Sequence, residues 1–226
     1  MKKITLILIF ISIHFGSIAQ GKYQIGTLPT LNINKKLENN WQINFKSEFR
    51  QLFKEGSFGK NNTGEYIYVH TDAAFIASKK VGLNNKLAGG FLLRFKNKDV
   101  IKRAIQQFTI ITRYNSFRLG QRFASDQTFK KNESIEWRLR YRLTLDFPLN
   151  GQAIDKNEWY LKVNNEYLNK FISEKYDLEI RLTPVLGYVF TDNNKLEFGL
   201  DYRLNDFLDN PSRQRFWLAL NWYIII

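Results

Sequence analysis

The chain has 226 residues, 15% of them aromatic, and contains no cysteine. The absence of cysteine excludes disulfides, thiolate chemistry and a lipid-modified cysteine at the start of a mature protein. Lysine and arginine outnumber aspartate and glutamate by 34 to 21, which gives a formal net charge of +13 and raises the question of a nucleic-acid partner.

Residues 1–19 have the three parts of a cleaved secretory signal. Lys2 and Lys3 precede an apolar run over 4–15, and Ser17-Ile18-Ala19 has the small-x-small form of a cleavage site. The run is shorter than the roughly 20 residues of a membrane-spanning helix. We therefore predict one domain over residues 20–226 of an exported protein. Export argues against nucleic acid and makes outer-membrane lipid and lipopolysaccharide the expected partners of the positive charge.

The mature chain consists of repeated segments in which apolar and polar residues alternate. In residues 134–147 the apolar set is Ile135, Trp137, Leu139, Tyr141, Leu143, Leu145 and Phe147. A period of two predicts a β-strand with one apolar and one polar face, and no other apolar run is long enough for a transmembrane helix. The same pattern predicts strands, in chain order, over 28–36, 41–50, 66–75, 87–95, 104–114, 117–128, 158–168, 176–190, 195–204 and 215–226.

Asn, Asp and Gly between these segments predict hairpins, for example at Asn39-Asn40 and at Asn97-Lys98-Asp99. We therefore expect an all-β fold, a single antiparallel up-and-down transmembrane β-barrel of about 10 to 12 strands. Counting from Trp41 gives ten strands, and residues 28–36 would form an eleventh strand. Since bacterial barrels usually have an even number, that segment is either peripheral or one of twelve. Residues 54–64, 169–175 and 205–212 are expected to be longer loops.

Arginine and lysine are distributed differently, and this indicates what the polar faces meet. Most arginines fall within predicted strands, whereas most lysines, Lys170 among them, are assigned to turns. Guanidinium forms planar paired contacts with carboxylates, which favours an enclosed lumen over a solvated face. We predict an ion-pair ladder in the lumen, made of Glu48, Arg50, Asp72, Arg94, Arg113, Arg118, Arg122, Glu136, Arg138, Arg140, Arg142, Glu166, Asp201 and Arg203.

The last strand ends flush at Ile226, as is typical of outer-membrane barrels that the barrel assembly machinery recognises, although those usually end in an aromatic residue. Aromatic residues near strand ends predict interfacial girdles: Trp41, Tyr114, Phe117, Phe147, Trp159, Trp217 and Tyr223. The order of Glu48-x-Arg50, residues 138–142, Asn165-Glu166-Tyr167 and Gly187-Tyr188 resembles the uncharacterised Bacteroidota family called domain of unknown function 2490. The resemblance covers nearly all of the mature chain and implies an outer-membrane barrel without known catalytic residues.

The sequence contains little that predicts chemistry. His70 is the one histidine of the mature chain, and a lipid hydrolase would need it as general base beside Asp72, with Ser78 or Ser125 as nucleophile. Strand parity turns His70 inward, so we expect a polar lumen residue and no enzymatic activity. No metal, cofactor or phosphate-loop pattern is present. We expect a narrow pore, a loop-mediated binding protein or a structural envelope protein; the alternative is a soluble periplasmic barrel that binds an apolar ligand.

Overall fold

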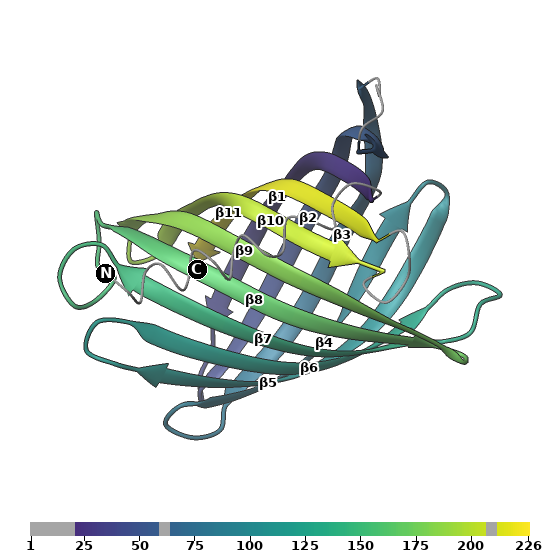
Figure 1. Cartoon of the computed structure of the whole chain (residues 1–226). Helices are drawn as coiled ribbons and strands as arrows, with labels where there is room; N and C mark the ends of the chain where they lie inside the picture. The colour runs from purple at the N-terminus through teal and green to yellow at the C-terminus, as the bar shows by residue number, and fades with distance from the viewer. Residues whose placement is uncertain (1–20, 59–63, 207–211) are drawn as a thin grey trace, which may run out of the picture.

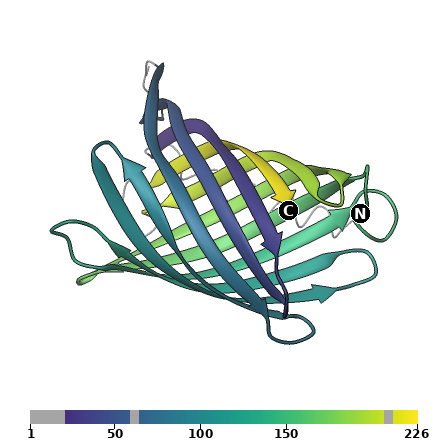
Figure 2. The same ribbon diagram turned by 180° about the vertical axis from the view of Figure 1, so that it is seen from behind.

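The computed structural model describes residues 21–58, 64–206 and 212–226, so the predicted signal at 1–19 lies outside the described residues. The described part forms eleven strands that close into one barrel (Figure 1, Figure 2). It contains no helix long and apolar enough to cross a membrane. The strands are β1 (Lys22–Lys36), β2 (Trp41–Ser57), β3 (Gly64–Lys80), β4 (Asn85–Lys96), β5 (Asp99–Arg113), β6 (Arg118–Phe129), β7 (Glu136–Pro148), β8 (Trp159–Ile172), β9 (Lys175–Thr191), β10 (Asn194–Asn205) and β11 (Arg213–Ile225).

The barrel closes through a parallel pair of strands. Each strand pairs antiparallel with its neighbour in sequence, but β1 runs parallel to β11 from Lys22, opposite Arg213, to Asn34, opposite Ile225. Strand direction alternates along the chain, so in an odd-numbered barrel the first and last strands run the same way. The all-β barrel and its strand number are confirmed. The purely antiparallel topology and the even count are wrong, because residues 22–36 are a full member of the wall.

The two open ends of the barrel are called rim A, where β1 begins, and rim B, where β1 ends. Rim A lies on the right in Figure 1. Asn39 and Asn40 have φ of 54° and 63°, and Asn97 has φ of 54°, as tight hairpins require. The predicted long loop over 169–175 is wrong, because β8 and β9 continue to a tight turn in which Ser173 has φ of 52°.

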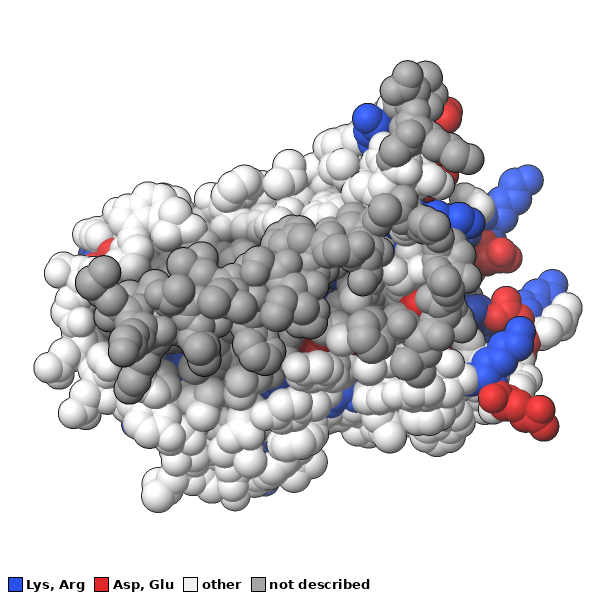
Figure 3. Space-filling view, viewed as in Figure 1, with Lys and Arg blue, Asp and Glu red and all other residues white. Residues whose placement is uncertain are grey.

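The outer wall carries most of the large apolar side chains. Phe91 and Leu139 are each 50% exposed, and Phe198 is 58% exposed. In Figure 3 the parts of the wall that the grey atoms leave visible are mostly white, and charged side chains gather at rim A on the right. The alternation that predicted a two-faced strand at residues 134–147 therefore separates an apolar outer wall from a polar interior.

One irregularity changes the alternation in β3. The register between β2 and β3 shifts between Arg50 and Gln51, which is a β-bulge. Because an extra residue reverses the faces beyond it, Val69 lines the interior rather than the outer wall. A strict period of two counted back from Phe75 would have placed Val69 on the outer wall, so alternation alone fails at this position.

Candidate functional site: the charged lumen

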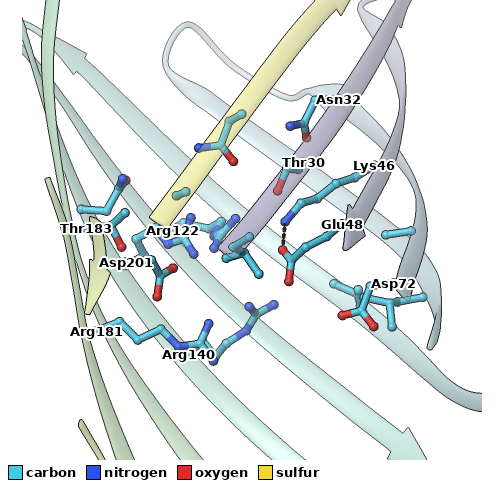
Figure 4. Close-up of a pocket in the computed structure, with 18 of the residues that line it drawn as sticks. Thr30, Asn32, Lys46, Glu48, Asp72, Arg122, Arg140, Arg181, Thr183 and Asp201 are labelled. Atoms are coloured by element: carbon cyan, nitrogen blue, oxygen red, sulfur yellow. Dashed lines mark hydrogen bonds and ion pairs between the residues drawn. The ribbon is translucent and has the colours of Figure 1, made fainter. Parts of the chain in front are cut away.

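The barrel encloses a cavity of about 980 Å³, lined by side chains of all eleven described strands. On β6 the cavity is lined by Arg118 at rim B and reaches Lys130, which follows the strand at rim A. The cavity therefore extends along the full length of this strand. Figure 4 shows side chains from several strands pointing into it, among them Lys46, Glu48, Arg122, Arg140, Arg181 and Asp201.

On the wall formed by β6 to β9, two buried carboxylates each hold several arginines. Glu166 is 1% exposed and lies 2.8 Å from Arg142, 3.0 Å from Arg181 and 3.1 Å from Arg122. Asp126 is fully buried and contacts Arg138 at 2.7 Å and Arg140 at 2.9 Å. Each carboxylate is neutralised more than once, so these contacts leave positive charge on the wall.

The opposite wall pairs its charges more evenly. Glu48 lies 2.7 Å from Lys46 and 2.9 Å from Arg50. Arg94 donates two hydrogen bonds of 2.7 Å to the two oxygens of Asp72. This planar, bidentate contact is the geometry that guanidinium and carboxylate favour.

The structure brings thirteen of the fourteen predicted ladder residues into ion pairs. Besides the pairs above, Arg118 contacts Asp146 at 2.7 Å, Asp201 contacts Arg203 at 2.6 Å, and Glu136 lies 3.7 Å from Arg138. Arg113 is the exception: it is exposed at the end of β5 and takes part in no ion pair within the described ranges. A strand end reaches beyond the enclosed part of the lumen, so parity alone does not place Arg113.

Sequence reasoning missed further lumen cations. Lys46, Lys162 and Lys170 line the cavity and form ion pairs with Glu48, Glu197 and Glu179. The assignment of Lys170 to a turn is wrong because β8 continues to Ile172. The signal was present, since each of these lysines shares strand parity with an inward carboxylate or arginine. Arg103, Arg181 and Arg215 line the cavity as well.

Aromatic side chains fill parts of the lumen. Trp217 is 2% exposed and packs with Leu28 and Leu52, and a Cβ at Gly26 would overlap its ring. Arg50 lies over the same ring, 5.1 Å from its centroid. The assignment of Trp217 to an outer aromatic girdle is therefore wrong. Gly26 lies opposite Trp217 in the parallel pair of β1 and β11. The alternation within a single strand does not predict this register.

A second aromatic group lies near rim B. Tyr160 donates a 2.6 Å hydrogen bond to Glu197, and its ring occupies the space where Gly187 has no Cβ. Lys195 lies 4.6 Å from the ring centroid of Tyr223, which lines the cavity. Tyr223 is thus also an inward residue rather than part of an outer girdle. These groups narrow the lumen and fix its charged side chains in place.

The charge balance of the lumen is strongly positive. Within the described ranges, seventeen lysines and arginines line the cavity. They face seven lining carboxylates and the two buried ones, Asp126 and Glu166, so the excess is eight positive charges. Ion pairs involve thirteen of these cations, but several cations share one carboxylate, so the excess positive charge is available to an anionic solute.

The residues needed for a lipid hydrolase are not assembled around His70. His70 is 3% exposed, and its Nε2 lies 3.8 Å from Asp72. Ser78 lies eight residues further along β3, about 26 Å away at the rise of a strand. Ser125 belongs to the other sheet face and accepts a hydrogen bond of 3.1 Å from Gln127. No group of three or more potential metal ligands occurs in the described part of the chain.

Fold and lumen together define a closed β-barrel with an ion-lined interior. The chain belongs to the family described as protein of unknown function (DUF2490), whose sequence model matches residues 25–217. This confirms the resemblance inferred from the strand motifs. Comparison with curated proteins and with solved structures found no match.

Proposed function

We propose that this chain is a β-barrel of the bacterial outer membrane that acts as a narrow, anion-selective pore and has no enzymatic activity. The observation that carries the proposal is the inverted polarity of the wall, apolar outside and charged inside. A soluble carrier of apolar ligands would need the reverse arrangement. Here ions from most strands line the interior, which argues against that alternative.

Strand length supports a membrane-spanning role. The shortest strands, β4, β6 and β10, have 12 residues each. At about 3.3 Å per residue they extend roughly 40 Å, and a tilt near 40° leaves about 30 Å along the barrel axis. That height matches the hydrocarbon thickness of a bilayer. Lipid and lipopolysaccharide would then surround the apolar wall, and the barrel assembly machinery would insert it.

The positive lumen supports anion selectivity. Fixed cations attract anions and repel cations in a confined path, and eight uncompensated positive charges make this the dominant field inside the barrel. A barrel of about ten strands leaves a small interior, and the aromatic groups at Trp217 and Tyr160 reduce it further. We therefore propose a path for small solutes rather than a wide general porin.

The pore is tested by planar-bilayer recording with the refolded protein across a KCl gradient. We expect small conductance steps. Their reversal potential should be shifted from zero towards the equilibrium potential of chloride. A reversal potential shifted towards the equilibrium potential of potassium would overturn anion selectivity. The absence of any conductance would overturn the pore and leave a binding or structural role.

A further inference from the structure

We propose that a row of cations in the lumen binds phosphate-bearing anions and carries them along the pore. This proposal rests on the proposed pore function and adds a substrate class to it. The row follows the hydrogen-bonding direction, so that each member lies directly opposite the next on the neighbouring strand. Its six cations are Lys86, Arg122, Arg142, Arg181, Arg203 and Arg215.

The strand registers give an unbroken row. Lys86 on β4 lies opposite Thr109, and Thr109 lies opposite Arg122. Arg122 faces Arg142 on β7, which faces Glu166 on β8. On the far side of Glu166, the row continues through Arg181, Arg203 and Arg215, each on the next strand along. At rim A the row reaches Gln24 on β1, which lies opposite Glu55 on β2.

The row runs from one end of the lumen to the other. Lys86 is near the start of β4 at rim B, and Gln24 is near the start of β1 at rim A. Strands in a barrel are tilted, so a line at right angles to them winds along the axis as it passes around the wall. With strands about 4.8 Å apart, the eight steps cover roughly 38 Å. All six cations line the cavity.

The charge pattern of the row is not what stability alone would select. Arg122 faces Arg142, and Arg203 faces both Arg181 and Arg215. Like charges directly opposite each other destabilise a sheet. Between Lys86 and Gln24, Glu166 is the row's one carboxylate, although Glu179 also pairs with Arg181 and Asp201 with Arg203. Three carboxylates therefore face six positive charges, which leaves three charges without a carboxylate of their own.

A second row on the same wall, four residues further along β6, shows the alternative arrangement. There Asp126 lies opposite Arg138, Arg138 opposite Lys170, and Lys170 opposite Asp177. Two cations and two anions balance, as expected for a structural row. The contrast within one wall indicates that the excess charge of the first row serves a ligand.

Arginine is the side chain suited to phosphate. Its planar guanidinium donates paired hydrogen bonds to two oxygens of one group, whereas a chloride ion offers no such geometry. The side chain of Arg215 forms no ion pair within the described ranges, and its Nε is buried without an acceptor. The Nε of Arg122 is likewise without one. An entering phosphate would supply the missing acceptors.

Two matched variants separate the row from lumen charge in general. Arg215→Gln removes a row cation and leaves no carboxylate unpaired. Arg103→Gln is the control, because Arg103 also lines the cavity, donates to the Thr128 hydroxyl at 2.9 Å, and lies off the row. Each variant removes one positive charge from the lumen, so a field effect alone would change both proteins equally.

The experiment measures chloride conductance in planar bilayers as inorganic phosphate is added at constant ionic strength, with acetate as a monovalent comparison. We expect phosphate, but not acetate, to reduce the chloride current. Arg215→Gln should raise the half-blocking concentration about tenfold, as the loss of a charge-assisted hydrogen bond predicts, and Arg103→Gln by less than about twofold.

Equal shifts in the two variants would overturn the row as the site. Chloride conductance without phosphate block would overturn the phosphate proposal and leave the pore intact. If the wild type does not conduct, equilibrium dialysis of labelled phosphate against the purified barrel decides instead. Binding weakened by Arg215→Gln but not by Arg103→Gln supports the row, and no saturable binding overturns it.

Discussion

At the scale of single residues, two glycines allow inward aromatic rings to pack against the barrel wall. Tyr160 reaches Glu197 because Gly187 leaves space for its ring, and Gly26 likewise leaves space for the ring of Trp217. In both places a close approach of ring and backbone fixes an inward aromatic.

Gly187→Ala should destabilise the folded barrel by about 1 to 3 kcal/mol, because the added methyl overlaps the ring of Tyr160. The measurement is the urea midpoint of unfolding in detergent. Gly120→Ala is the matched control, since a Cβ there lies at an ordinary 3.5 Å from Thr144. Equal midpoints for the two variants would contradict the packing described for Tyr160.

Glu166→Gln should cost about 3 to 5 kcal/mol, because it leaves Arg122, Arg142 and Arg181 without their shared carboxylate. Glu133→Gln, which removes an exposed partner of Lys130, should change stability by less than about 1 kcal/mol. The same urea titration compares both. A small effect at Glu166 would mean that the arginines are held by other contacts.

At the scale of strands, alternation predicted which side chains face inward wherever the strand is regular. Thirteen of the fourteen ladder residues form ion pairs, and they share one face of the wall because a period of two is a property of the strand backbone. The bulge opposite Arg50 turns the side chain of Val69 to the interior. The local sequence gives no sign of this bulge. Lysines such as Lys46 were missed because residue type outweighed parity in the sequence reasoning.

An arginine on the outer wall should impair insertion. Leu143→Arg, near the middle of β7, should cost about 2 to 4 kcal/mol if that wall meets lipid. Leu143→Phe should be tolerated, because a lipid-facing position has no close-packed neighbour to displace. The yield of folded protein in lipid vesicles measures both. Normal assembly of the arginine variant would reverse the assignment of inside and outside.

The parallel seam between β1 and β11 makes a separate prediction. The chain lacks cysteine, so Ile33→Cys combined with Ile224→Cys introduces one pair at directly opposed positions. Strands about 4.8 Å apart suit a disulfide. We expect rapid oxidation, seen as faster migration of the unfolded protein without reductant. Ile33→Cys with Leu220→Cys, four residues out of register, should not cross-link; if it did, the seam would be misaligned.

At the scale of the whole molecule, the sequence predicted an all-β barrel but not how it closes. The sequence pattern predicts a strand over residues 28–36, yet the usual even count argued for a different role, and the parallel seam is a non-local pairing that no short pattern encodes. The winding cation row cannot be read from the sequence either, because it appears only when eight strand registers are known together. What the sequence does carry is the polarity of each strand.

The central claim is that this polarity places the barrel in a membrane with its apolar wall outward. The most direct measurement is fractionation of cells that express the full chain, followed by gel electrophoresis of heated and unheated samples. We predict recovery with the outer membrane and a shift in mobility on heating, because a closed barrel resists detergent until unfolded. Recovery in the soluble periplasmic fraction, with no shift on heating, would contradict the account.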